Sequence, residues 1–424
     1  MSARAASGVS STPPPLDLWL AGLCSSRFLI NLIQMSYAAS LPVLRSAWGM
    51  SATQAGSVAT GFQIGYAVSL LGFSSLADHI GAKKVVAISA ALSAAATMGF
   101  ALLARSYATA LALYTIVALS QGGTYAGSLM LIADRYDSAR RGSAMGWLIA
   151  SSSLSHAAAL VIAGIALPRG GYSLAFLVTG IGTVAGALVV LFALRGTPNV
   201  VHPRRAGMHV RSEVLRNPEA MRLTAGYTFH SWELLGMWAW APAFMAASLA
   251  ASGATAIRSV QVGSYISASF HVMGLLASSS MGHLSDRLGR RLVLFTLATT
   301  SAACSLVFGW LIAAPALIIA AVGAVYAFSA LGDSPVLSAA LSEAVRPAYL
   351  GAALALRSFL GFGAGAIAPL VFGAILDATN PPGATPATWG WAFTALGLGG
   401  LIAAFSAYGV RAAGRGGDTG ALKA

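Results

Sequence analysis

The sequence predicts an all-α membrane protein with twelve transmembrane helices arranged in two pseudo-symmetric halves of six helices each. Three observations predict it: the composition, the recurrence of long apolar runs, and an internal repeat. The chain has 424 residues, of which 57% are hydrophobic and only 9% are charged. Soluble domains carry about 25% charged residues. We therefore expect lipid, rather than water, to surround most of this chain.

Twelve apolar runs, each of about 20 residues or more and so long enough to cross a bilayer core, follow one another along the chain. They are 18–44, 51–75, 83–104, 106–132, 141–166, 172–194, 219–249, 258–282, 291–313, 315–341, 349–376 and 387–409. A Pro- and Arg-containing loop, 195–218, separates a first bundle (17–194) from a second bundle (219–410). We expect 1–16 to be a disordered tail and 411–424 to be a second tail. The first run lacks a clear cleavage site, so we do not interpret it as a cleaved signal peptide.

The positive charges are placed asymmetrically. The net charge is +13, but 19 of the 25 Lys and Arg residues fall on one side of the predicted membrane, with four on the other side and Arg27 and Arg357 inside runs. Cytoplasmic loops carry such an excess, which predicts that both termini are cytoplasmic. The basicity is therefore a topological signal, and no nucleic-acid partner is expected. The abundance of Arg, Ala and Gly favours a bacterial source, and hence the inner membrane.

An acidic residue, a glycine and a basic cluster occur together twice. The loop after the second run contains Asp78, Gly81, Lys83 and Lys84, and the loop after the eighth contains Asp286, Arg287, Gly289, Arg290 and Arg291. The two acids are 286 − 78 = 208 residues apart, and Asp134 and Glu343 give a similar offset of 209. A long offset between membrane-type segments indicates a duplicated bundle, with its halves parallel because six spans return the chain to the same side.

These loops resemble the hallmark loop of the major facilitator superfamily, and the resemblance extends over essentially all twelve runs. The second copy is the fuller one, since the first has Ser74 and His79 where a glycine and a basic residue are usual. The resemblance implies a monomeric, cofactor-free transporter whose halves alternate access to a central cavity. It also implies that the basic residues meet Asp134 and Glu343 and latch the outward-open state. The alternative is that these charges only set topology.

Four charged residues lie inside the predicted spans, and such residues are functional candidates by default. Asp333 lies 8 residues before position 341 and Arg357 lies 8 residues after position 349, so both are about 12 Å deep. This predicts an ion pair between them, or a pair that titrates during turnover. Arg27 and Glu233 lie on the first and seventh runs, which both border the cavity in the family resembled. We therefore expect a contact between them that bridges the halves.

Further polar side chains share helical faces with these charges. Arg27, Asn31 and Gln34 are spaced i, i+4 and i+7, which is one face of a helix. The predicted substrate-binding residues are Arg27, Asn31, Gln34, Gln63, Tyr66, Gln121, Tyr125, His230, Glu233, Trp240 and His271, and proton coupling or an ion pair is expected at Glu233, Asp333 and Arg357. For any single Gln or Tyr, an interhelical hydrogen bond is the alternative. His156 has no polar stripe around it and is expected to be structural.

Arg27 is the best clue to the solute, because its planar guanidinium suits carboxylates and other oxyanions. We predict secondary transport of a small, organic anion together with protons. The alternative is proton-driven export of lipophilic or cationic compounds, with Glu233 and Asp333 binding the cation. Against it, the fifth run lacks the Gly-Pro motif of the superfamily's drug antiporters and Ala118 stands where their Arg is common. The same absences leave facilitated diffusion or exchange open.

Another class of function is an integral-membrane enzyme or a sensor. The sequence shows no nucleophile motif, no metal-spaced His/Cys set and no Gly-rich phosphate loop. We therefore expect no catalytic residue, no metal and no cofactor.

Overall fold

A computed structural model describes residues 17–201, 214–346, 349–381 and 387–410. Both predicted tails and the middle of the predicted loop, 202–213, lie outside the described residues. Within the described ranges the chain is helical and contains no β-strand. The first group of helices is α1 (Leu18–Trp48), α2 (Ala52–Ile80), α3 (Ala82–Leu103), α4 (Tyr107–Arg135) and α5 (Ser138–Ala193). The second group is α6 (Pro218–Ala251), α7 (Ala256–Leu288), α8 (Arg290–Phe308), the short 3-10 helix η2 (Gly309–Leu311), α9 (Ala316–Ala344), α10 (Leu350–Thr379) and α11 (Gly390–Tyr408).

Local sequence explains where several helices begin. Ser51 accepts a hydrogen bond from the backbone N–H of Gln54, whose side chain accepts one from the backbone N–H of Ser51, so a complete capping box starts α2. Asp17 caps α1 by accepting from the N–H of Leu20. Asn217 caps α6 in front of Pro218, the first residue of the helix. Such caps satisfy backbone donors that the first helical turn leaves without partners.

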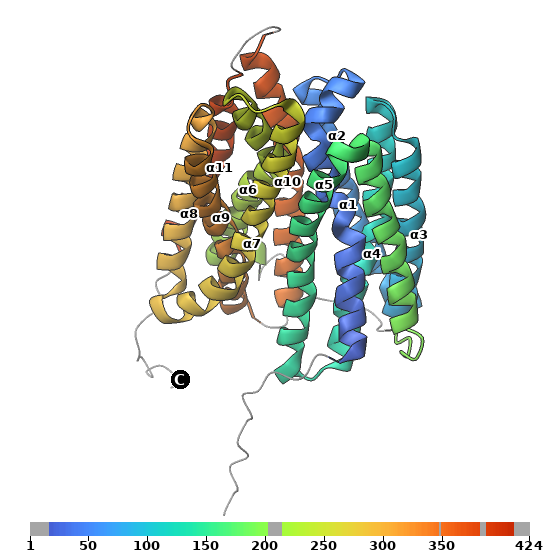
Figure 1. The fold of residues 1–424 in the computed structure, drawn as a ribbon. Coiled ribbons are helices and arrows are strands. Elements are labelled where there is room, and N and C mark those ends of the chain that lie inside the picture. The colour runs from blue at the N-terminus through green and yellow to red at the C-terminus, as the bar shows by residue number, and fades with distance from the viewer. Residues whose placement is uncertain (1–16, 202–213, 347–348, 382–386, 411–424) are drawn as a thin grey trace, which may run out of the picture.

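The helix α5 contains two of the predicted runs. Its 56 residues would extend about 84 Å if straight, far more than a bilayer core of about 30 Å. The backbone is not helical at Gly170 and Gly171, where Gly171 adopts a φ of 64°, and α5 turns back on itself there (Figure 1). If α5 is counted as two spans, the number of long helices is twelve, which equals the number of predicted runs.

Ten helices in the described part of the chain, with α5 counted once, are long and apolar enough to cross a membrane. α2 is not among them, since it carries polar residues such as Gln54 and Gln63. The protein is therefore a multi-pass membrane protein, whereas twelve as the number of crossings stays a prediction.

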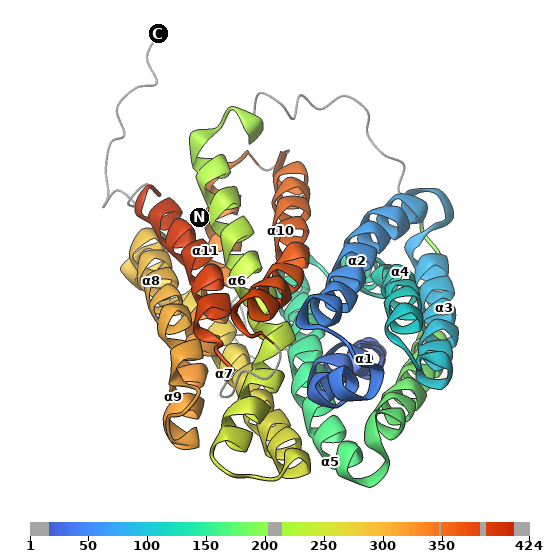
Figure 2. The same cartoon turned by 90° about the horizontal axis from the view of Figure 1, so that it is seen from above.

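The helices form two groups that lie side by side. Seen from above, α1–α5 occupy one side and α6–α11 the other (Figure 2). Lys83 Nζ donates a hydrogen bond to the carbonyl of Thr197 over 2.7 Å, and Arg222 donates one to the carbonyl of Gly409 over 3.0 Å. The start of α3 thus meets the end of α5, and the start of α6 meets the end of α11. We call this end of the molecule, which carries the Gly81 and Gly289 turns, the basic end.

At the opposite end, Asp377 of α10 joins the two groups. Its carboxylate accepts hydrogen bonds from the backbone N–H groups of Ala52 and Thr53, each over 2.8 Å, and from the hydroxyl of Thr53 over 2.6 Å. An acid from one group thereby caps the first turn of α2 in the other group. The helix dipole favours a negative charge at this position. A charge-assisted bond of this kind is worth about 1.5–3 kcal/mol.

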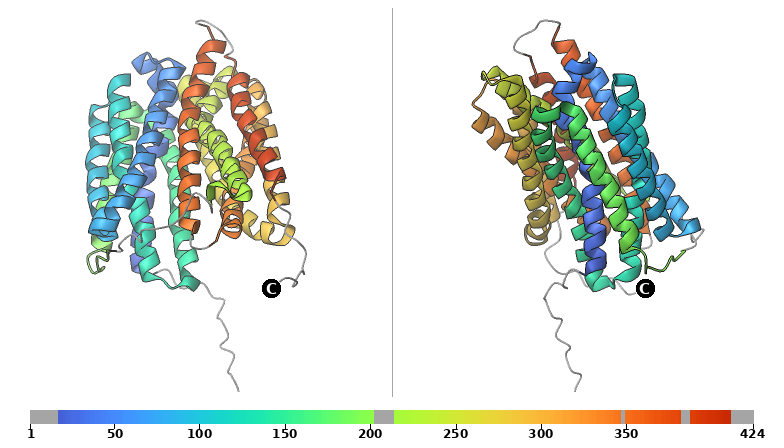
Figure 3. Two further views of the ribbon diagram at one scale, coloured as in Figure 1. Left: turned by 180° about the vertical axis from the view of Figure 1, so that it is seen from behind. Right: turned by 45° about the vertical axis from the view of Figure 1, so that its right-hand side comes forward.

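The helices α2 and α10 approach each other closely beside this cap, and Figure 3 shows them adjacent from behind. A Cβ atom on Gly56 would lie 2.2 Å from the carbonyl oxygen of Pro369, and one on Gly373 would lie 2.2 Å from that of Ala52. Only glycine fits at both positions. Small residues permit this backbone contact between helices in lipid, and together with Asp377 they close the opposite end.

We predict that Asp377→Ala loosens the closure at the opposite end, because three hydrogen bonds to one carboxylate are lost. Spin labels at the exposed positions Arg105 and Pro381, in a background with Cys24 and Cys304 replaced by Ser, will show a longer or broader distance distribution. The control is Asp137→Ala. Asp137 also caps a helix, but within its own group, so this change should leave the distance unaltered. Identical distributions in both variants would refute the closing role of Asp377.

Candidate functional site

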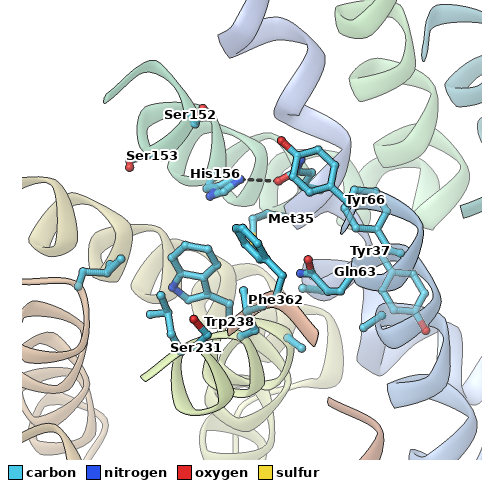
Figure 4. Close-up of a pocket in the computed structure, with 18 of the residues that line it drawn as sticks. Met35, Tyr37, Gln63, Tyr66, Ser152, Ser153, His156, Ser231, Trp238 and Phe362 are labelled. Atoms are coloured by element: carbon cyan, nitrogen blue, oxygen red, sulfur yellow. Dashed lines mark hydrogen bonds between the residues drawn. The ribbon is translucent and has the colours of Figure 1, made fainter. Parts of the chain in front are cut away.

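A cavity of about 300 Å³ lies between the two groups of helices. Pockets for small molecules begin at about this size. Figure 4 shows Trp238 and Phe362, from the second group, lying around the same space as Gln63, Tyr66 and His156 from the first. Seven of the predicted substrate-binding residues line it: Arg27, Gln34, Gln63, Tyr66, Tyr125, His230 and Trp240. Asn31, Gln121, Glu233 and His271 are not among its lining residues.

Arg27 is held in the cavity wall by neutral partners. Its Nε donates to the hydroxyl of Ser152 over 2.8 Å and its Nη2 donates to the hydroxyl of Tyr66 over 3.1 Å. The guanidinium carbon lies 4.6 Å from the centroid of the Tyr125 ring. The residue is only 7% exposed, and its Nη1 has no hydrogen-bond partner in the described part of the chain. A buried guanidinium is thus fixed in place with one donor unused.

Gln34 links α1 to two other helices of its group. Its Nε2 donates to Oε1 of Gln121 over 3.3 Å, and its Oε1 lies 2.8 Å from Nε2 of His156. Asn31 and Gln121 are both fully buried, and Gln121 donates to the carbonyl of Ile30 over 3.3 Å. Asn31 and Gln121 therefore support the wall of the cavity instead of facing it.

His156 was expected to be structural, but it lines the cavity and forms a ring cluster across the two groups. Its ring centroid lies 5.4 Å from that of Trp238 and 5.3 Å from that of His271, and the Trp238 and His271 rings are 5.2 Å apart. Its polar neighbours Gln34 and His271 come from other helices, so the sequence of its own helix gives only a weak signal. Ser152 and Ser153, one helical turn before it, were the available clue.

Asp333 does not form the expected ion pair with Arg357. Its Oδ1 lies 2.9 Å from Nδ1 of His230, whose Nε2 lies 2.9 Å from the hydroxyl of Ser334. The expectation rested on the similar distance of Asp333 and Arg357 from the ends of their helices, and such a distance does not give the rotation of a helix. α9 packs more closely on α6 than on α10, so Asp333 meets His230 on α6.

Glu233 does not contact Arg27. It is 3% exposed and lies inside the second group, where a Cβ atom on Gly400 of α11 would approach its carboxylate to 2.7 Å. The cavity-facing stripe of α6 runs from His230 through Leu234 to Trp238. Glu233 precedes Leu234 by one residue, a rotation of about 100° around the helix. Glu233 therefore points away from the cavity.

Arg357 lies outside the cavity lining, whereas Trp240 belongs to it and also has a packing role. Arg357 donates through Nη1 to the hydroxyl of Ser338 over 2.8 Å and lies 4.1 Å from the ring centroid of Tyr227. Trp240 borders the cavity, but its ring is fully buried. It stacks on Phe372 at 5.1 Å and donates to the carbonyl of Pro369 over 3.0 Å. Trp240 thus packs α6 against α10.

The repeated loops have the same backbone form at the basic end. Gly81 has a φ of 88° and Gly289 a φ of 90°, a region that L residues avoid, and each glycine joins two helices without a further linker. Arg290 lies 2.6 Å from Asp286 and 2.8 Å from Glu343. In the first copy, Lys83 bonds to the carbonyl of Thr197 and the backbone of Lys84 to the side chain of Asn199.

A sequence profile described as Major Facilitator Superfamily matches residues 23–259, more than half of the chain. The chain belongs to this superfamily. It is therefore a transporter and not an enzyme, as the sequence predicted. The Gly81 and Gly289 turns correspond to the loops on which the resemblance was based.

Two curated relatives of this superfamily member carry transporter names. It is 25% identical over 372 residues, 80% of each chain, to the "Probable 4-methylmuconolactone transporter" of Cupriavidus pinatubonensis. It is 24% identical over 240 residues to the "Probable anion transporter 3, chloroplastic" of Oryza sativa subsp. japonica, covering 51% of this chain and 46% of that protein.

Solved transporter structures share the fold of this superfamily member. A mutant form of the nucleoside transporter NupG superposes with a TM-score of 0.74 at 16% identity, covering 92% of this chain and 99% of that one. A D-xylose-proton symporter gives a TM-score of 0.73 at 15% identity, covering 92% and 97%. These likenesses establish the all-helical transporter fold.

We predict that the buried contact of Asp333 stabilises the transporter more than the exposed contact of Asp286. The Asp333 side chain is 6% exposed, whereas that of Asp286 is 55% exposed. Breaking a buried pair costs about 3 kcal/mol or more, and an exposed pair is worth about 1 kcal/mol or less. Thermal unfolding in detergent should show a much larger loss for Asp333→Ala than for Asp286→Ala. Equal losses would contradict the burial argument.

Proposed function

We propose that this superfamily member moves a small organic anion across the membrane by alternating access of its central cavity. Arg27 carries the proposal, because it is a buried, positively charged residue that lines the cavity and its Nη1 has no hydrogen-bond partner among the described residues. Leaving such a donor without an acceptor is costly. A carboxylate of the solute supplies the acceptor and also neutralises the charge.

The lining of the cavity favours an anion over a cation. Its described lining residues include Arg27, His156 and His230 but no Asp or Glu. A cationic drug would meet a guanidinium and no carboxylate, so the export hypothesis has less support. The printed name of the rice relative, an anion transporter, agrees with the choice. The name of the Cupriavidus relative, a transporter of 4-methylmuconolactone, suggests an organic solute.

We place the basic end on the cytoplasmic side of a bacterial inner membrane, because cytoplasmic loops carry an excess of positive charge. With the opposite end closed by Asp377 and the glycine contacts, the structure then represents a state that is shut toward the outside. The contacts of Arg290 with Asp286 and Glu343 stay within the second group. Because these contacts are already present in a state that is shut toward the outside, they set the geometry of the cytoplasmic turn and give a latch of the outward-open state no support.

The cotransported proton is held at the pair formed by His230 and Asp333. His230 lines the cavity and is 3% exposed, and the acid beside it is similarly buried. The imidazole and the carboxylate, 2.9 Å apart, together offer a site for one proton beside the cavity. A proton that enters with the anion removes the cost of moving negative charge inward, which is about 2.3 kcal/mol per 100 mV. Glu233 lies away from the cavity and is less well placed for this task.

We predict that Arg27→Gln strongly weakens the binding of anions, because a neutral amide retains donors but loses the charge. Charge-assisted hydrogen bonds contribute about 1.5–3 kcal/mol, so affinity should fall by about ten- to a hundredfold. Uptake of 4-methylmuconolactone and of butyrate and succinate into proteoliposomes, with thermal stabilisation by the same compounds, measures the effect. Arg258→Gln, a change at an exposed arginine, is the control. Unchanged anion uptake in Arg27→Gln would sink the proposal.

We predict that Asp333→Asn separates solute movement from the proton gradient. Exchange of solute across proteoliposomes at equal pH should persist, because Arg27 is untouched, while accumulation driven by an imposed pH gradient is lost. Glu233→Gln is the matched comparison and should keep gradient-driven accumulation. If Glu233→Gln uncouples and Asp333→Asn does not, the proton is carried at Glu233 instead.

A further inference from the structure

Two arginine–tyrosine pairs lie on opposite sides of the boundary between the helix groups. In the first group, the Arg27 guanidinium carbon lies 4.6 Å from the centroid of the Tyr125 ring. In the second group, the Arg357 guanidinium carbon lies 4.1 Å from the centroid of the Tyr227 ring. Both tyrosine rings line the cavity. The pairs are not related by the internal repeat, since they come from α1 with α4 and from α6 with α10.

Both arginines are more than nine-tenths buried and incompletely bonded. Arg27 is 7% exposed with its Nη1 unpaired, and Arg357 is 8% exposed with its Nε unpaired in the described part of the chain. Neither forms an ion pair among the described residues, and Asp333, the buried acid nearest to the cavity lining, lies against His230 instead. An isolated buried charge is expensive, so two such charges call for two negative charges from elsewhere.

The two pairs face the same cavity. Tyr125 and Tyr227 both line it, and each ring covers one of the two guanidinium groups. Tyr227 packs against Gly361 of α10, where a Cβ atom would lie 2.5 Å from its ring. This contact fixes Tyr227 between Arg357 and the cavity. Arg27 is itself a lining residue, whereas Arg357 contributes its charge from behind the Tyr227 ring.

We propose that the solute is a small dicarboxylate, one carboxylate of which binds Arg27 while the other is received at Tyr227 with Arg357 supplying the second charge. Two guanidinium groups on different halves suit two separated carboxylates better than one phosphate, whose charges lie on a single group. The hydroxyl of Tyr227 can donate to a carboxylate. The inference deepens the proposed anion transport and rests on it.

The test compares dicarboxylates with monocarboxylates of equal length: succinate with butyrate, glutarate with pentanoate, and adipate with hexanoate. Thermal stabilisation of the purified, full-length protein is titrated with each compound, since a ligand that binds the folded state raises its stability. We expect at least one dicarboxylate to bind tenfold or more tightly than its partner. No preference for any dicarboxylate would overturn the inference and leave the anion proposal standing.

Variants locate the second subsite. Arg357→Gln should lose the preference for dicarboxylates but keep binding monocarboxylates, which also shows that it has folded. Arg357→Lys, which keeps the charge, should restore most of the preference. Arg27→Gln should lose both classes of ligand, and the exposed-site control Arg258→Gln should lose neither. An undiminished preference in Arg357→Gln would overturn the role of Arg357, while unchanged binding in Arg27→Gln would overturn the anion proposal itself.

Discussion

The guanidinium of Arg27 is the charge on which the proposed function depends. It lies on a membrane-spanning helix, where water is scarce and every polar group must find its partner within the protein or in a ligand. Ser152 and Tyr66 hold two of its nitrogens, and the face of Tyr125 covers it. These neutral partners fix the direction of the group without cancelling its charge. A carboxylate from the protein in their place would have stabilised the fold, but it would also have occupied the position that the carboxylate of the solute takes in the proposed function.

The internal repeat explains the similar turns between helices in the two halves, but it does not explain which residues line the cavity. Gly81 and Gly289 keep equivalent backbone forms because each must reverse the chain between two spans in one residue. No such constraint acts on the cavity, where in the proposed function each half meets a different part of the solute. The halves accordingly contribute different residues: Arg27 and His156 from one, and His230 and Trp238 from the other.

The sequence predicted the long helices, the glycine turns and seven of the residues that line the cavity, because hydropathy and helical periodicity are local properties. It could not predict which way α6 and α9 are rotated. Asp333 and Arg357 were expected to meet because of their similar distance from the helix ends, yet Asp333 faces His230 and Arg357 meets Ser338. Glu233 lies only three residues from His230 but points toward α11. The contribution of His156 depends on Gln34, 122 residues away, and no pattern within α5 contains that information.

A solute that bridges the halves affects their equilibrium only if it binds one arrangement better than the other. In the described state, Asp377 and the glycine contacts hold the opposite end closed. Arg27 and Arg357 belong to different groups, so a dicarboxylate held by both resists their separation, whereas a monocarboxylate held by Arg27 alone does not. Neutralising two buried charges also removes the mutual repulsion of the groups that carry them. In the proposed function, the two arginines therefore select a dianion and also let it shift the equilibrium between the halves more strongly than a monoanion does.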